Sequence, residues 1–217
     1  MGLLDMLEGE NGRAPAEGRI SGVVRAVVTD NQDLTTQGRV QVRIPTIPDI
    51  EPWAPVCAPF AGDGYGLWCI PQVDDVVILA FENGDVNYPV VVGSVWDLTN
   101  SPPVDLPTDA QFKRVLKTPL GHELVFDDLE MEITLTHMAG HKLTIAVDGI
   151  TLELAKGLGK LQLSLPGTAT LSGAVSAEVS AKSTSVKGDV SLDLSGAATN
   201  LTANATCKVQ GSLVTIN

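Results

Sequence analysis

The C-terminal part of the chain alternates small apolar residues with Ser, Thr and other polar residues. The stretch LSGAVSAEVSAKSTSVKGDVSLDLSG at 171–196 shows the pattern over more than two dozen positions, without an aromatic residue or a proline. A period of two puts successive side chains on opposite faces of a strand, so one face of this segment is predicted to point inward. The residues predicted to line that interior are Leu161, Leu163, Leu165, Val175, Ala177, Val179, Val190, Leu192, Leu194, Leu201, Ala203, Ala205 and Val209.

This segment contains too few large apolar residues to form a core by itself. Many of the inward positions are alanine, which predicts a narrow interior, and glycine recurs at an interval of eight, as at Gly149 and Gly157 and at Gly188 and Gly196. A repeated glycine indicates a corner turned at a fixed interval. A homotrimer of intertwined chains, in which each chain supplies one wall of a triangular prism, satisfies these demands and leaves no lateral strand edges. The alternative is a single-chain β-solenoid, which usually needs a longer repeat and a polar cap.

The front of the chain has a different pattern, with five short β segments separated by turn residues. The expected strands lie in 19–30 (RISGVVRAVVTD), 38–45 (GRVQVRIP), 66–71 (GLWCIP), 74–84 (DDVVILAFENG) and 87–96 (NYPVVVGSVW). Asn83, Gly84 and Asp85 predict a tight turn between the last two, because Asn-Gly supports positive φ. Five strands in about eighty residues without a helical repeat are typical of a small barrel of the OB type.

Composition separates the same two parts. All nine Phe, Trp and Tyr residues lie at or before Phe126, and twelve of the thirteen prolines lie at or before Pro119, so the two parts cannot share one kind of fold.

Several motifs of the front part resemble the OB-fold domain of central spike proteins from contractile injection systems, a family that includes phage baseplate spikes and the VgrG spikes of type VI secretion. The resemblance rests on Gly38-Arg39-Val40, the loop from Gly62 to Gly66, and above all FENGDVNYPVVVGSVW at 81–96. The motif residues singled out are Trp53, Pro71, Phe81, Gly84, Asp85, Pro89 and Gly93. Asp74 departs from the family, which usually has glycine there. Gly121-His122-x-Leu124 recurs as Gly140-His141-x-Leu143 and is similar to the neck where such spikes begin to wind.

The resemblance implies an all-β protein with an N-terminal OB barrel and an intertwined homotrimeric triple-stranded β-helix, a β-prism needle. The expected divisions are an N-terminal arm at 1–17 that could dock on a hub, the barrel at 18–97, a Pro-rich linker or neck at 98–119, and the spike shaft and tip at 120–217. The implied function is mechanical: the spike punctures the target envelope when the sheath contracts. The resemblance also implies partners: a second and third copy, a baseplate hub protein, baseplate wedge or effector proteins, and, only transiently, the target membrane. A PAAR-repeat tip protein would sit on a platform made by Leu213, Val214, Thr215, Ile216 and Asn217.

The net charge and the surroundings of the aromatic residues disfavour nucleic acid as a partner. The net charge is −12, and no Lys accompanies Trp53, Trp68 or Trp96, whereas phosphate binding needs clustered cations. Two alternatives remain: an OB-fold oligonucleotide or oligosaccharide binder on a trimeric stalk, and a receptor-binding fibre tip, which usually ends in an aromatic-rich head.

Catalytic chemistry has no signature in the sequence, which lacks a GxSxG elbow, an HExxH motif and a P-loop. We therefore predict no enzyme and no cofactor. We also predict no metal site; three copies of His122 or His141 on a trimer axis would be the ligands if there were one. The three cysteines match neither a zinc site nor a CxxC pair, and the N-terminus has no basic region of a signal peptide. The expected location is a baseplate, on a virion or a phage-tail-like particle, after synthesis in the cytoplasm.

Overall fold

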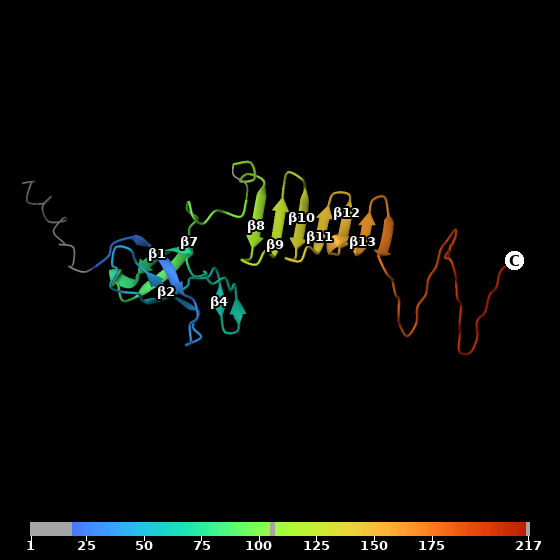
Figure 1. The fold of residues 1–217 in the computed structure, drawn as a ribbon, viewed down its shortest axis with the longest axis horizontal. Helices are drawn as coiled ribbons and strands as arrows, with labels where there is room; N and C mark the ends of the chain where they lie inside the picture. The colour runs from blue at the N-terminus through green and yellow to red at the C-terminus, as the bar shows by residue number, and fades with distance from the viewer. Residues whose placement is uncertain (1–18, 105–106, 216–217) are drawn as a thin grey trace, which may run out of the picture. The chain divides into compact units, whose positions relative to one another are not determined.

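The protein is all-β in a computed structural model that describes residues 19–104 and 107–215. The chain falls into two compact units, one ending at Leu135 and the other beginning at Thr136. Fourteen strands lie in the described residues (Figure 1): β1 Val23–Asp30, β2 Arg39–Arg43, β3 Trp53–Pro55, β4 Ala61–Gly62, β5 Tyr65–Gly66, β6 Val76–Phe81, β7 Pro89–Ser94, β8 Lys113–Lys117, β9 Glu123–Asp127, β10 Glu132–Thr136, β11 Lys142–Ala146, β12 Gly149–Glu153, β13 Gly159–Ser164 and β14 Thr168–Gly173. Two 3-10 turns, Glu82–Gly84 and Ala155–Gly157, are the helical elements of these ranges.

The first unit contains a five-stranded antiparallel sheet in the order β3-β2-β1-β6-β7. Its two edge strands meet through a bridge between Val56 and Val91, where the N–H of Cys57 donates to the Val91 carbonyl at 2.8 Å. The sheet therefore curls on itself into a small barrel, as the strand pattern predicts.

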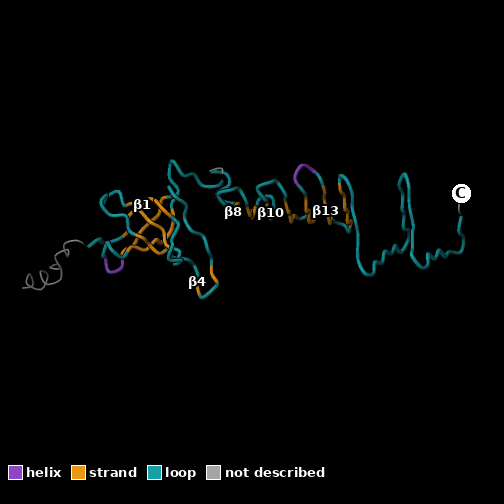
Figure 2. Tube along the Cα trace, turned by 60° about the horizontal axis from the view of Figure 1, so that its bottom comes forward, coloured by secondary structure: helices purple, strands orange, loops and turns teal. Residues whose placement is uncertain are grey.

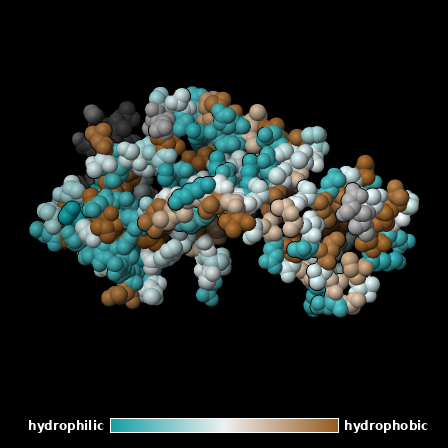
Figure 3. All heavy atoms as spheres, turned by 45° about the vertical axis from the view of Figure 1, so that its right-hand side comes forward, coloured by the Kyte–Doolittle hydropathy of each residue, from teal (hydrophilic) through white to brown (hydrophobic). Residues whose placement is uncertain are grey.

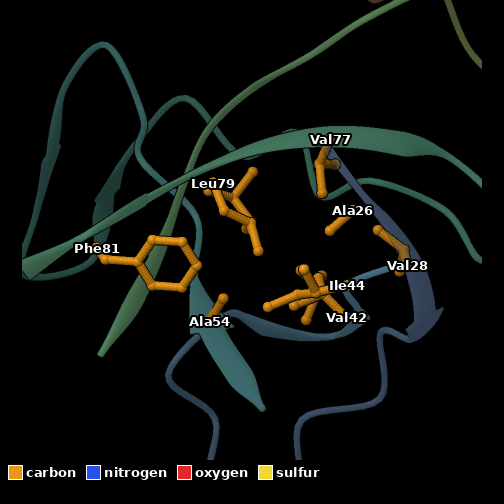
Figure 4. Packing of buried hydrophobic residues seen from close by; sticks show 10 residues of the cluster. Ala26, Val28, Val42, Ile44, Ala54, Val77, Leu79 and Phe81 are labelled. Carbon is orange, nitrogen blue, oxygen red and sulfur yellow. The ribbon is translucent and has the colours of Figure 1, made fainter. Parts of the chain in front are cut away.

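The core of the barrel comes from alternate positions of its strands. On β6 the buried side chains are Val77, Leu79 and Phe81, while the residues between them face outward. The cluster consists of Ala26, Val28, Val40, Val42, Ile44, Ala54, Val77, Leu79, Phe81 and Val91, and Figure 4 shows most of it pointing into one interior.

The third predicted strand, 66–71, is wrong. Only Tyr65–Gly66 pairs, with Ala61–Gly62, and the third strand of the sheet is Trp53–Pro55. Gly64, with φ of 76°, lets the chain fold back as a short two-stranded arm, β4–β5. The apolar residues that follow the arm line a groove instead of joining a ladder.

The predicted tight turn after β6 is confirmed. Asn83 and Gly84 have φ of 51° and 79°, and Pro89 then begins β7 with a buried ring. A Cβ on Gly84 would lie 3.1 Å from the carbonyl oxygen of Ile20, so the backbone of the first strand segment also approaches closely here.

The loop between β1 and β2 is organised by the carboxylate of Asp33. Its oxygens accept hydrogen bonds from Arg39 Nε at 3.2 Å and Arg39 Nη2 at 3.1 Å, and from the N–H groups of Thr35 and Gln37. The Arg39 guanidinium lies 5.7 Å from the ring centroid of Trp53. The Arg39 side chain is thus held between Asp33 and Trp53. The hydrogen bonds from Arg39 hold the pKa of Asp33 well below its ordinary value.

The second sheet has seven strands in the order β14-β13-β12-β11-β10-β9-β8. Strand β8 lies inside the segment predicted as linker or neck, so an ordered element begins there before Pro119. Gly157 and Gly167 occupy turns, in agreement with the predicted corners.

No strand follows β14 in the described residues, and Figure 2 draws 174–215 as loop. The alternation from Val175 to Val209 therefore does not produce a ladder within one chain, because no neighbouring strand of the same chain supplies the hydrogen bonds.

We expect Leu79→Ala to lower the free energy of unfolding of the barrel by about 2–5 kcal/mol, because the side chain is 0% exposed and leaves a cavity. Urea unfolding followed by tryptophan fluorescence measures this, since all three tryptophans belong to the first unit. Leu34→Ala, at a residue 94% exposed, is the control and should cost less than about 0.5 kcal/mol. Equal losses in the two variants would contradict the core assignment.

Replacing Asp33 by Asn should reduce stability at neutral pH but not in acid. Because the folded-state pKa is lowered, the charged carboxylate stabilises the fold above its ordinary pKa of 3.8, and that contribution is lost as pH falls below about 4. The difference in unfolding free energy between wild type and Asp33→Asn should therefore be constant near neutrality and shrink in acid. Asp63→Asn, in the exposed β4–β5 turn, is the charge-matched control. A pH-independent difference would rule out this role of the Asp33–Arg39 pair.

Candidate functional site

The internal repeat Gly-His-x-Leu corresponds to two turns of the same construction. In the first, the Thr118 N–H donates to the His122 carbonyl at 2.8 Å and Gly121 N–H donates to Thr118 at 2.9 Å. In the second, His137 N–H donates to the His141 carbonyl at 2.8 Å and Gly140 N–H donates to His137 at 2.7 Å. Both glycines have positive φ, 95° and 89°, which explains their place in the repeat.

Two of the histidines of these turns accept hydrogen bonds from backbone N–H groups. Nδ1 of His137 accepts from Ala139 N–H at 3.0 Å, and Nδ1 of His141 accepts from Ala155 N–H at 3.1 Å. A neutral imidazole that accepts at Nδ1 carries its hydrogen on Nε2, so neither His141 nitrogen offers a metal a lone pair in this arrangement. In the described ranges there is no cluster of three or more His, Cys, Asp or Glu side chains able to hold a metal ion.

The sheet of the second unit has one apolar face. Strands β11 to β14 are in register so that their apolar residues lie opposite one another, while the intervening positions are polar. The apolar rows are Leu143, Leu152, Leu161, Leu171 and Ile145, Ile150, Leu163, Ala169; the polar rows are Thr144, Thr151, Gln162, Thr170 and Lys142, Glu153, Lys160, Ser172. Leu152, Leu161 and Leu163 are 48%, 43% and 48% exposed, so no part of 19–104 or 107–215 covers this face.

The predicted interior residues are exposed throughout. Leu161 and Leu163 belong to the apolar face of the sheet, and Leu165 follows it. Beyond β14 the exposed fraction is higher still, 95% at Val175 and 100% at Val190. At the predicted tip, Leu213 and Val214 are exposed as well, whereas Ile216 and Asn217, like the arm at 1–17, lie outside the described residues. Figure 3 shows hydrophobic residues on the visible surface of the molecule.

The motif residues of the barrel occupy structural positions. Phe81 is in the core, Pro71 and Pro89 are buried, and Gly84 and Asp85 form the turn between β6 and β7. Gly93 follows a bulge of β7, where the register against β6 shifts. These residues shape the barrel and bring no reactive groups together.

Two features of the barrel were missed from the sequence. Arg25, Trp96, Asp97 and Leu98 line a groove of ≈ 650 Å³, with Trp96 67% exposed. A second groove, of ≈ 580 Å³, lies beside the β4–β5 arm and includes both Cys57 and Cys69. Arginine stands beside two of the three tryptophans, which a search for neighbouring lysines in the sequence does not find.

None of the helices in 19–104 and 107–215 has the length and hydropathy needed to span a membrane.

Residues 24–96 match the family of type VI secretion system/phage-baseplate injector OB domains. Over 80 residues, 37% of this chain, the sequence is 36% identical to the actin cross-linking toxin VgrG1 of Vibrio cholerae, covering 7% of that protein. It is equally similar, at 36% over 80 residues, to the type VI secretion system spike protein VgrG3 of Vibrio cholerae, covering 8% of it. The identity to spike protein VgrG1b of Pseudomonas aeruginosa is 28% over 119 residues, 44% of this chain and 16% of that protein.

The chain therefore spans less than a fifth of the length of these relatives. Residues 24–96 therefore form an injector OB domain, and through this domain the chain is similar to the VgrG spike proteins of type VI secretion systems.

Proposed function

We propose that this chain is the central spike of a contractile injection machine, a homotrimer whose second unit continues as a triple-stranded β-helix and punctures the target envelope. The observation that carries the proposal is the uncovered apolar face of β11–β14. Its rows of Leu and Ile are about half exposed, and burying the rest of each side chain yields roughly 1 kcal/mol. No second layer from the described part of the chain lies on this face, so other copies are the simplest cover.

The residues after β14 support three copies better than two. A pair of sheets would cover β11–β14 as a sandwich, but the interior positions from Val175 to Val209 include Ala177, Ala203 and Ala205, which suit a narrow axis between three walls. Backbone groups of this segment have no ladder within the chain and would pair between neighbouring chains. A single-chain solenoid is disfavoured for the same reason, since its coils would already be paired in one chain.

The mechanical role follows from this arrangement. Interchain pairing along the shaft leaves no part able to open cheaply, so the trimer transmits the force of sheath contraction to the target membrane, which it contacts only transiently. The barrels would seat on a baseplate hub protein, beside wedge or effector proteins. The segment Leu213–Asn217, of which Leu213 and Val214 are exposed, would carry a PAAR-repeat tip protein. Assembly would take place at the baseplate of a virion or phage-tail-like particle.

The chain is proposed to be structural and not an enzyme. One relative is named an actin cross-linking toxin, but the segment shared with it amounts to 7% of that protein. The motif residues in the barrel serve packing and turns, which supports a structural role.

Substituting one face of β12 tests the trimer. Leu152→Asp places a charge on the apolar face, whereas Thr151→Asp places the same charge on the opposite face one residue away. Light scattering of the native particle should give about three times the 22.8 kDa of one chain for wild type and Thr151→Asp, and a monomer for Leu152→Asp. A monomeric wild type, or the same native mass for the two variants, would contradict the proposal.

Removing the tip tests the platform. Deletion of residues 213–217 should leave the trimer mass unchanged and abolish binding of the purified PAAR-repeat protein of the same machine, measured by calorimetry. Lys208→Ala, which trims an exposed side chain before the platform, should bind normally. Undiminished binding by the truncated trimer would place the tip protein elsewhere.

A further inference from the structure

The outer face of strands β1, β6 and β7 is apolar. The first row across the three strands consists of Val23, Ala80 and Val90. The second row consists of Arg25, Ile78 and Gly93. In the third row Val27 of β1 lies opposite Val76 of β6. These positions alternate with core residues such as Ala26, Val77 and Val91, so their side chains point out of the barrel. Val23 is 61% exposed and Val92, in the β7 bulge, 48%.

An antiparallel barrel that meets water on its outside should carry polar residues there. Strand β2 follows this rule, with Arg39, Gln41 and Arg43 at its outward positions. The apolar strip is therefore confined to β1, β6 and β7, where both faces of the sheet are hydrophobic, which marks a surface that a partner covers.

The groove beside Arg25 extends this strip. Arg25 is part of the strip and also lines the groove of ≈ 650 Å³ together with Trp96 and Leu98. Asp97, in the same groove, accepts hydrogen bonds from the N–H groups of Thr99 and Asn100 at 2.8 and 2.7 Å, which shapes the turn that presents Trp96. An exposed Trp beside an Arg is a combination enriched at the centres of protein interfaces.

The charges on this surface indicate the partner. Outward strand positions in and beside the strip carry Arg25 and Arg43, which borders the strip opposite Val27, and no carboxylate. The groove adds one carboxylate, Asp97, which accepts hydrogen bonds within its own turn and lies near Arg25, so the surface keeps an excess of positive charge. A second copy packed face to face would bring two positively charged surfaces together. Nucleic acid is disfavoured because the centre of the strip is aliphatic and because the chain carries a net charge of −12.

We propose that Val23, Ile78, Ala80, Val90 and Val92, with Arg25 and Trp96 at the groove, form the docking surface for a separate protein whose contact face has an apolar centre and carboxylates opposite the two arginines. The inference rests on the proposed function in one respect, that the partner is the hub protein on which the barrels seat. Apolar contact supplies the binding energy, and the arginines fix orientation and speed association.

Titration of the full-length chain with the purified hub protein of the same machine tests the surface. Val23→Asp and Arg25→Glu should each raise Kd at least tenfold with the native mass unchanged. Both residues point outward, so neither change disturbs the core. Leu34→Asp, on an exposed loop of the same unit, is the matched control and should bind as wild type.

Several results would overturn the proposal. They are the absence of hub binding by wild type, unchanged affinity in both variants, and a fall in native mass in Val23→Asp, which would make the strip a contact between copies. Binding of a fluorescein-labelled single-stranded oligonucleotide that Trp96→Ala or Arg25→Glu abolishes would assign the groove to nucleic acid instead. If wild type binds the hub as a monomer and the variants do not, the trimeric spike fails while this surface stands.

Discussion

The rest of this structure depends on one constraint: a sheet with a single apolar face needs a cover, and the second unit contains none. The register of β11–β14 aligns Leu and Ile in unbroken rows, so the apolar face is continuous and cannot be removed by a local rearrangement. In the proposed trimer this part of the molecule is stabilised by association with the other copies, in contrast to the barrel, whose core is closed by its own strands.

Much of the fold could be predicted because it depends on local rules. Period-two alternation located β1, β2, β6 and β7, and the Asn83-Gly84 pair located their connecting turn. The GLWCIP segment misled because hydrophobic residues that line a groove look, in sequence, like a buried strand. Strand β3 was missed because three residues carry too little pattern. For 174–215 the alternation is present in the sequence, but no described strand pairs with this segment, so a prediction of strands from alternation alone fails there within one chain.

The candidate surfaces were less predictable than the fold. The repeat of Gly-His-x-Leu was interpreted as a neck, and the sequence predicted neither the two like turns that it forms nor the hydrogen bond that His141 accepts from the N–H of Ala155, fourteen residues further on. The groove at Arg25 and Trp96 joins residues some seventy positions apart, so only the pairing of β1 with β6 and β6 with β7 brings it together. The sequence alone does not reveal that valines on β1 and β7 point outward to the surface, because a strand with apolar residues on both faces has the same pattern as a strand that is buried on both faces.

The succession of hairpins from β11 to β14 has a directional consequence. Each strand in this sheet is joined to the next by a ladder whose hydrogen bonds run along the line in which the strands succeed one another. Compression along that line pushes neighbouring strands closer together than their normal spacing of about 4.8 Å, and the van der Waals repulsion between their backbones then rises steeply. Tension along it loads one ladder after another and can open the hairpins singly. The sheet is therefore suited to being driven into an obstacle and poorly suited to being drawn back out.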